Sequence, residues 1–276
     1  MKHWRIDDMA WEQFDASRVD PEIVLLVKAA SVVERNGTDY ATYLKNVFTD
    51  DPDFRMAAQN WSVEEVQHGD ALGRWAMLAE PSWDYPAAFA RYRAAYSIPI
   101  EVDASVRGSR TGELIARCMV ETGTSSFYTA LADATGEPVL KAICKQIAAD
   151  EYRHFKLFYD HMQRYLKREQ IGVLRRTRIA LGRVTETEDD ELALAFHCTN
   201  EAAGLPYDHQ RCIAAYMSRA MGFYRRPHLD RAVGMIFKTI GFTPHGRVRR
   251  AASALAFLAL RRRRSRFIAR ATGDAT

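Results

Sequence analysis

The motif Glu-x-x-His occurs twice in this sequence of 276 residues, once with Glu65 and His68 and once with Glu151 and His154. Residues three positions apart on a helix project from the same face, so each motif can direct a carboxylate and an imidazole at one point. Carboxylate and imidazole together form a donor set for transition-metal ions such as iron. The sequence therefore carries two candidate metal-binding pairs, provided that both motifs lie on helices.

A further glutamate precedes each motif at nearly the same distance. Glu34 lies 31 residues before Glu65, and Glu121 lies 30 residues before Glu151, so the two halves superpose at an offset of 86 or 87 residues. One glutamate from each of two helices, with a Glu-x-x-His motif from each of two others, is the ligand set of di-iron and di-manganese carboxylate bundles. We expect each motif to serve one ion, with Glu34 and Glu121 bridging or chelating. The predicted metal ligands are Glu34, Glu65, His68, Glu121, Glu151 and His154.

The requirement for metal ions follows from the charge of these ligands. Four carboxylates inside a helical bundle would repel one another, and burying them without compensation would be very costly. Two divalent ions would offset that cost, and mixed carboxylate and imidazole ligands favour iron or manganese over zinc. The alternative, surface acids with incidental histidines, is disfavoured by apolar neighbours such as Trp61, Leu72, Ile147 and Phe155. We expect two Fe²⁺ ions, with Mn²⁺ as the other candidate.

Helical periodicity dominates the chain, and the dense β-branched alternation that is typical of a sheet is missing. Four long helices before residue 170 indicate a four-helix bundle at about 20–170, in which 86–109 would be the long crossover. Additional helices would form a C-terminal extension over about 171–276. The predicted helices span 23–48, 53–79, 86–97, 110–134, 138–168, 187–203, 207–223, 228–240 and 246–270.

The composition disfavours several classes of protein. Gly (15) and Pro (9) are too scarce for a turn-rich all-β fold, and no Gly/Ser linker divides the chain, so we expect one domain, 1–276. The sequence contains no run of about 18 apolar residues, the length that a membrane-spanning helix needs. We also see no apolar signal segment at the N-terminus. The cysteines form no Cys-x-x-Cys pair, which argues against zinc ribbons, thioredoxin-type and rubrerythrin-type proteins. These observations together predict a protein of the reducing cytoplasm.

The formal net charge of +4 hides an uneven distribution. The tail 245–276 contains nine arginines and one acid, Asp274, while the rest of the chain has more acids than bases. Its apolar run, 251–260, is too short to span a bilayer, but with flanking arginines it could lie at a membrane surface. An acidic protein partner and an inert terminus are the alternatives, and nucleic acid is not expected because the arginines lack interleaved aromatic residues. The arginines predicted to contact a partner are Arg261, Arg262, Arg263, Arg264 and Arg266.

The residues around the predicted ligands resemble those of the soluble acyl-[acyl-carrier-protein] desaturases. Residues 61–70 (WSVEEVQHGD) are similar to the first iron motif of that family, 150–154 (DEYRH) to the second, and 121–124 (ETGT) to its third-ligand segment. The resemblance covers about 25–165 and implies a homodimeric, ferritin-like bundle around a non-haem di-iron centre. It also implies O₂ and a reduced ferredoxin as co-reactants, and a place for Thr124 beside the oxygen-binding face.

Two acids stand immediately before the ligand glutamates of the motifs. A metal-bound histidine usually donates its other N–H to a carboxylate, which fixes the tautomer and the orientation of the ring. From the approximate twofold relation of the halves, we expect Asp150 to hold His68 and Glu64 to hold His154. The first of these contacts is also a feature of the resembled family. We interpret Trp4 as a core aromatic residue rather than as an electron relay.

The resemblance implies an O₂-dependent di-iron oxidoreductase, most specifically a fatty acyl-[acyl-carrier-protein] desaturase that inserts a double bond into a bound acyl chain. Acyl-carrier protein, or another acyl substrate, and a ferredoxin-type donor are the implied partners. A di-iron hydroxylase or N-oxygenase would share the ligand set and stays an alternative. A bacterioferritin-like iron-storage or detoxification protein also carries paired Glu-x-x-His motifs, but about 100 residues after the bundle would obstruct the packing of a cage.

Overall fold

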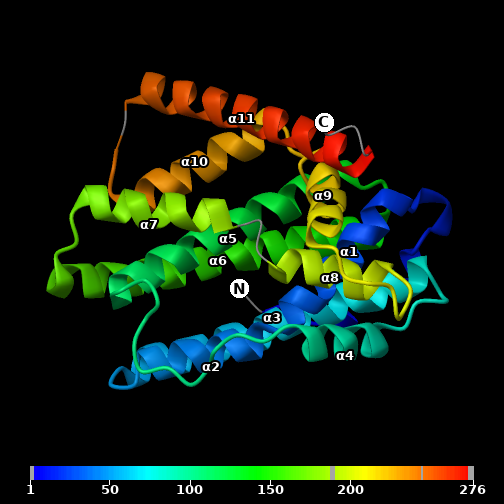
Figure 1. The fold of residues 1–276 in the computed structure, drawn as a ribbon, viewed down its shortest axis with the longest axis horizontal. Coiled ribbons are helices and arrows are strands. Elements are labelled where there is room, and N and C mark those ends of the chain that lie inside the picture. Colours follow the sequence, from blue (N-terminus) through cyan, green and yellow to red (C-terminus); the bar gives the residue numbers. More distant parts are fainter. Residues whose placement is uncertain (1–2, 187–189, 244, 273–276) are drawn as a thin grey trace.

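The computed structural model describes residues 3–186, 190–243 and 245–272, and every regular element in these ranges is a helix (Figure 1). The prediction of an all-α chain is confirmed. Among the described residues, no helix combines the length and the apolarity that crossing a membrane requires. Short 3-10 turns precede the α-helices, which are α1 (Pro21–Arg35), α2 (Gly37–Val47), α3 (Pro52–Ala79), α4 (Tyr85–Ala95), α5 (Arg110–Ala134), α6 (Pro138–Glu169), α7 (Val173–Thr185), α8 (Asp190–Asn200), α9 (His209–Ala220), α10 (Arg226–Ile240) and α11 (Gly246–Thr272).

The long helices begin where a polar side chain accepts hydrogen bonds from the first backbone N–H groups. Asp51 caps α3, Ser109 caps α5 and Glu137 caps α6 in this way. Proline follows the cap in α1, α3 and α6. Its lack of an N–H costs nothing there, because the N–H at the first helical position has no partner within the helix. Because these signals are local, the observed bounds of α3, α5 and α6 lie within one residue of the predicted ones.

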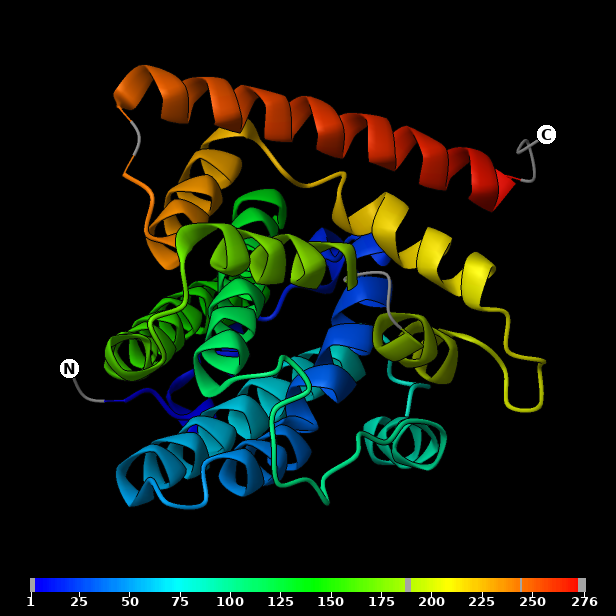
Figure 2. The same ribbon diagram turned by 60° about the vertical axis from the view of Figure 1, so that its left-hand side comes forward.

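The ligand-bearing helices form two pairs. α1 packs along α3, α5 packs along α6, and contacts between α3 and α6 join the two pairs. The later helices surround these pairs: α8 and α9 pack against α1, and α7 and α10 pack against α5 (Figure 2). α7 is an element that the sequence pattern did not predict, and residues 187–189 of the helix predicted over 187–203 lie outside the described residues.

One predicted helix is in fact two helices. The sequence pattern predicts a continuous helix over 23–48, but α1 ends at Arg35 and α2 begins at Gly37. A Cβ at Gly37 would lie 2.5 Å from the Cβ of Glu65, and a Cβ at Gly69 would lie 2.6 Å from the backbone nitrogen of Arg35. Only glycine fits at such short separations. The break between α1 and α2 therefore packs closely against the turn of α3 that carries the predicted ligands Glu65 and His68.

A long connection carries the chain from the end of α3 to the start of α5 (Figure 1). It includes α4, which packs mainly against α8. The segment that follows runs beside α2, where Asn46 Nδ2 donates to the backbone oxygen of Ile100 at 2.8 Å. Farther along, the backbone N–H of Val106 donates to the hydroxyl of Tyr43 at 3.3 Å. α4 and this segment together correspond to the crossover that the sequence predicts over 86–109.

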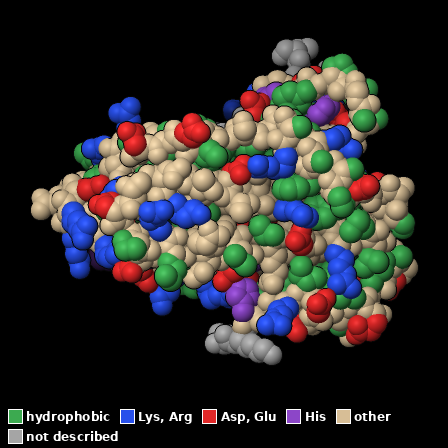
Figure 3. Space-filling view, turned by 90° about the horizontal axis from the view of Figure 1, so that it is seen from below, with side chains coloured by type: hydrophobic (Ala, Val, Ile, Leu, Met, Phe, Trp, Pro, Cys, Tyr) green, Lys and Arg blue, Asp and Glu red, His purple; other side chains and the backbone are tan. Residues whose placement is uncertain are grey.

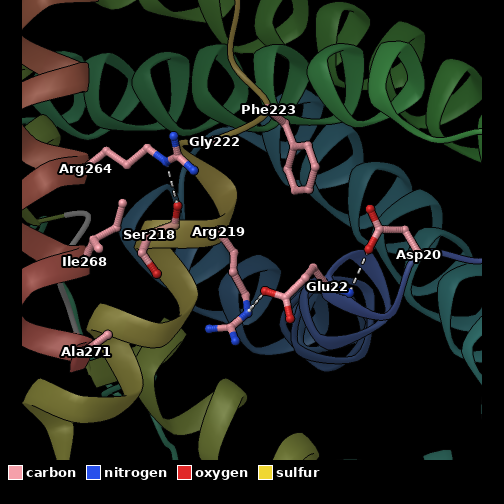
Figure 4. A pocket seen from close by; sticks show the side chains of 9 residues that line it. All are labelled: Asp20, Glu22, Ser218, Arg219, Gly222, Phe223, Arg264, Ile268 and Ala271. Carbon is pink, nitrogen blue, oxygen red and sulfur yellow. Dashed lines mark hydrogen bonds and ion pairs between the residues drawn. The ribbon is translucent and has the colours of Figure 1, made fainter.

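The C-terminal helix packs on α9 and α10, and Figure 4 shows its contacts with α9. Arg264 of α11 donates from Nε to the backbone oxygen of Ser218 in α9 at 3.1 Å. Arg219 of α9 in turn pairs with Glu22 of α1, with 2.7 Å between Nε and Oε2. A pocket of about 430 Å³ lies at this junction. Arg264, one of the arginines predicted at a partner surface, therefore also contributes to the docking of α11 on α9.

Candidate metal centre

The six predicted ligands meet inside the molecule. Glu34 comes from α1, the first Glu-x-x-His motif from α3, Glu121 from α5 and the second motif from α6. All six side chains are buried. They form two overlapping groups, within each of which the potential ligand atoms lie within 4.8 Å of one another. One group is Glu34, Glu65, His68 and Glu151, and the other is Glu65, Glu121, Glu151 and His154.

Two glutamates belong to both groups. Oε1 of Glu65 lies 3.9 Å from Nδ1 of His68 and 3.1 Å from Nδ1 of His154. Oε1 of Glu151 lies 3.2 Å from Nδ1 of His68 and 3.7 Å from Nδ1 of His154. Each of these two oxygens thus faces both imidazoles. The glutamates of the two motifs therefore occupy the positions that bridging ligands would take between two ions.

The other two glutamates each face one imidazole. Glu34 Oε2 lies 3.5 Å from Nδ1 of His68, and Glu121 Oε2 lies 3.7 Å from Nδ1 of His154. The expectation that Glu34 and Glu121 bridge or chelate stays a prediction, and these distances favour the chelating role, because each glutamate lies beside one imidazole. The repeat places Glu34 and Glu121 at opposite ends of the cluster, because their helices, α1 and α5, belong to different pairs.

The atoms that face the centre of the cluster have no hydrogen-bond partner. Buried polar atoms in proteins are nearly always hydrogen-bonded, so a concentration of unpartnered ones requires an explanation. Carboxylate oxygens and imidazole nitrogens are also the donor atoms that iron and manganese accept. The donor set therefore fits divalent metal ions. The unpartnered atoms are Glu34 Oε2, Glu65 Oε1, His68 Nδ1, Glu121 Oε1, Glu151 Oε1 and His154 Nδ1.

His68 is oriented by a buried carboxylate on its far side. Its Nε2 lies 3.0 Å from Oδ2 of Asp150, which leaves Nδ1 for a metal ion. The indole N–H of Trp4 donates to the same carboxylate oxygen at 2.7 Å, and Arg153 Nη2 lies 2.6 Å from Oδ1. The contact between Asp150 and His68 is the one expected from the sequence. Trp4 holds this carboxylate in place as well as filling the core, a role that the sequence analysis missed.

His154 is oriented in the same way but nearer to the surface. Its Nε2 lies 2.9 Å from Oε2 of Glu64, the second contact expected from the sequence. Glu64 also pairs with His3, at 2.9 Å between Nε2 and Oε1, and these two side chains are 24% and 39% exposed. A surface pocket of about 420 Å³ lies outside this contact, and its lining residues are His3, Trp4, Arg5, Asn60, Val63, Glu64 and Gln67.

Two hydroxyl groups on one face of α5 donate to the ligand carboxylates. The hydroxyl of Thr124 donates to Oε2 of Glu151, and that of Tyr128 donates to Oε1 of Glu34 at 2.6 Å. Thr124 is the residue predicted to act in catalysis, whereas Tyr128 was not a predicted site residue. Tyr128 stands seven residues after Glu121, which is the helical spacing that places both on one face. Sequence periodicity could therefore have identified it.

Burial and mutual repulsion shift the acid–base equilibria of the cluster. Burial and the neighbouring Glu151 raise the pKa of Glu121 to about 8, and burial raises the pKa of Glu65 well above its ordinary value. Burial opposes a charge on the imidazoles, but the negatively charged carboxylates around them raise the pKa of His68 and of His154 well above the usual value. Metal ligands must be deprotonated, so ions that bind here must displace these protons.

Comparison with known proteins does not assign a family to this arrangement. No protein-family model matches the sequence, and a search of curated proteins gives no significant match. The function must therefore be inferred from the buried donor atoms and from the residues that hold them.

Proposed function

We propose that this protein is an O₂-dependent di-iron oxidoreductase built on a ferritin-like bundle of α1, α3, α5 and α6. The observation that carries the proposal is the pair of overlapping, unpartnered donor groups that share Glu65 and Glu151. A protein would pay a large desolvation cost to bury four carboxylates together unless cations compensate them. Iron is proposed first because of its redox chemistry, and manganese is the other candidate.

Two iron ions held here would supply the redox chemistry that activates O₂ and attacks an unreactive C–H bond. Glu34 and His68 would bind one ion, and Glu121 and His154 the other. The shared carboxylates of Glu65 and Glu151 would fix the separation of the two ions. The surrounding helices exclude water from the cluster, since all these side chains are buried.

Thr124 has the position to manage a proton at this centre. Its Oγ1 donates to Glu151, and it lies 3.3 Å from the backbone oxygens of Val120 and Glu121. A hydroxyl with backbone acceptors in reach can rotate away from Glu151 without becoming unpartnered. We propose that Thr124 Oγ1 holds a hydrogen bond toward the centre, either to Glu151 or to an oxygen atom that would bind beside it.

The proposed substrate is a fatty acyl chain on acyl-carrier protein, and the proposed reaction is desaturation with electrons from a ferredoxin-type donor. The likeness of 61–70, 121–124 and 150–154 to the motifs of acyl-[acyl-carrier-protein] desaturases supports this choice. That likeness also supports a homodimer. A reducing cytoplasm is the proposed compartment, which agrees with four cysteines that are buried and free.

Two alternatives differ in what they require of the molecule. A hydroxylase or N-oxygenase would use the same ligands and differ only in its substrate. An iron-storage protein would need open outer faces for assembly into a cage. Against storage stands the packing of α8 and α9 on α1 and of α7 and α10 on α5, because these helices cover the outside of the bundle.

Metal loading followed by turnover tests the proposal. The metal-free protein is titrated anaerobically with Fe²⁺, and we expect two ions per chain. Aerobic turnover with ferredoxin, its reductase and a panel of acyl-carrier-protein substrates should then give a product lighter by two hydrogens in mass spectrometry. A product heavier by one oxygen indicates the hydroxylase, and a large hollow oligomer that accumulates iron indicates storage.

A matched control comes from the same chain. His197 belongs to another His/Glu/Cys group, with Glu201 and Cys212, but Arg211 Nη2 lies 2.8 Å from Glu201 and opposes a cation there. His197→Ala should leave the iron content unchanged, whereas His68→Ala should lower it. Clearly fewer than two ions per wild-type chain would contradict the proposed centre.

A further inference from the structure

α11 is the outermost helix of the molecule and lies across one side of it (Figures 1 and 2). Its 27 residues give it a length of about 40 Å. It packs on α9 and α10, and Ser253 and Phe267 are its buried residues among those described. The rest of its length is half-buried or exposed, so a long helical face is presented outward.

The outward face of α11 carries apolar side chains. Leu255 is 67% exposed, Leu258 is 51% exposed and Val248 is 48% exposed. Their spacing of seven and three residues places them on one side of the helix. Phe267 follows Leu258 by about two and a half turns and therefore faces the opposite way, into the protein. These apolar side chains therefore point away from the core and are not part of its margin.

Arginines flank the apolar part of this face on both sides. Arg247, Arg249 and Arg250 lie in the first turns of α11, before Leu255, and Arg261, Arg262 and Arg266 follow Leu258, all of them exposed. A groove of about 510 Å³ is formed near the C-terminal end, and its lining residues are Ala259, Arg262, Arg263, Arg266, Phe267 and Arg270. Residues 246–272 contain no acid that could neutralise these charges.

The opposite side of the molecule has a different character. Seen from the side of α2, α3 and α4, basic, acidic and apolar side chains are interspersed (Figure 3). Such mixing is typical of a surface that only faces water. α11 differs from that surface because its exposed leucines are accompanied by arginines and by no acidic side chain.

We propose that the outward face of α11 docks on an anionic lipid bilayer. In this arrangement Leu255 and Leu258 enter the boundary between headgroups and acyl chains, and Arg262 and Arg266 pair with lipid phosphates. An interfacial helix gains from both contributions, apolar burial and attraction to anionic lipid. An acidic protein would satisfy the arginines, but the lipid boundary also accepts an elongated row of exposed aliphatic side chains.

Vesicle co-sedimentation of the iron-loaded, full-length protein tests this proposal. We expect the wild type to bind vesicles of phosphatidylglycerol and phosphatidylcholine, and to bind pure phosphatidylcholine vesicles much more weakly. The variant Leu255→Gln/Leu258→Gln and the variant Arg262→Gln/Arg266→Gln should each weaken binding about tenfold. Added salt should weaken the binding of the leucine variant more than that of the arginine variant.

A control variant on the opposite side is Arg55→Gln/Met56→Gln in α3, which removes one exposed cation and one exposed apolar side chain. It should bind vesicles as the wild type does. Iron content measured on every variant keeps this test separate from that of the metal centre. Wild-type protein that does not bind anionic vesicles overturns the proposal, as does binding that is unchanged in the leucine variant, which would indicate electrostatic attraction by the arginines without insertion of the leucines.

Discussion

The two halves of the candidate centre use the same motif and the same kind of support, yet they differ in their access to solvent. In the closed half, His68 is held by Asp150, whose side chain is 0% exposed. In the open half, His154 is held by Glu64, which is 24% exposed. The two contacts have nearly equal lengths, 3.0 and 2.9 Å. An internal repeat has thus produced two equal sets of contacts in two unequal environments.

The difference has a physical consequence for each half. A hydrogen bond to a fully buried carboxylate acts in a low dielectric, where it is stronger and less easily exchanged with water. The closed half should therefore hold its imidazole in one orientation. The open half, whose carboxylate borders the surface pocket beside His3, should exchange protons and water more readily.

The largest effect should come from the carboxylates that both halves share. Under the proposed function, Glu65→Ala would remove a ligand of both ions, whereas Glu121→Ala would remove a ligand of one. We expect the first variant to retain less than one iron per chain and the second to retain about one, measured by metal analysis after reconstitution. Equal losses in the two variants would contradict the assignment of Glu65 as shared.

The next effect distinguishes the two supporting acids. Replacing a carboxylate that orients a metal-bound histidine typically costs 10–100-fold in affinity or activity. Asp150→Asn should fall near the upper end of that range and Glu64→Gln near the lower end, because water can replace part of the exposed contact. Fe²⁺ titration of the two variants measures the difference, and the reverse order would show that burial does not set the strength of the support.

The protonation of the cluster predicts an opposite pH dependence for metal-free and metal-loaded protein. The pKa of Glu121 rises from 4.5 to about 8 on folding. Its contribution to stability is therefore complete below pH 4.5 and is lost as the pH rises through about 8. The raised pKa values of His68 and His154 act in the same direction.

Thermal melting across this pH range measures that dependence. The metal-free protein should lose stability as the pH rises, while the additional stability given by bound iron should grow, because the ligands lose their protons. Glu121→Gln should flatten the slope of the metal-free protein. A metal-free protein that becomes more stable toward pH 8 would refute the proposed protonation.

The smallest effects concern the outermost contacts of each half. Trp4→Phe keeps most of the packing but removes the N–H that donates to Asp150, and should cost about 1–3 kcal/mol of unfolding free energy. His3→Ala removes a half-exposed ion pair with Glu64 and should cost less than about 1 kcal/mol. Chemical denaturation of both variants measures the two costs. A greater loss for His3→Ala would reverse the distinction between a closed and an open half.

The features that the sequence predicts well are those encoded by neighbouring residues. The bounds of α3, α5 and α6 follow from caps and prolines at their starts, such as Asp51 and Pro138. The repeated spacing of Glu-x-x-His predicts which side chains meet. The contacts of Asp150 and Glu64 with the histidines follow from the same repeat, because each acid directly precedes a ligand.

The features that escape the sequence depend on which helices become neighbours. The bridging positions of Glu65 and Glu151 follow from the pairing of α3 with α6, which spacing along the chain does not fix. The break after Arg35 depends on the closeness of α3. The indole of Trp4 reaches Asp150 across 146 residues of sequence.

Gly37 of α2 and Gly69 of α3 set a requirement that the ligands themselves do not reveal. At Gly37 and Gly69 the space for even one methyl group is already taken by α3 and α1, respectively. Alanine at either position would leave charge and donor set unchanged while forcing the two backbones apart. A related chain that keeps all six ligands but carries a larger residue at 37 or 69 would have to hold its metal ions in a wider frame. Those two positions are therefore a stricter criterion for recognising true relatives than the ligands alone.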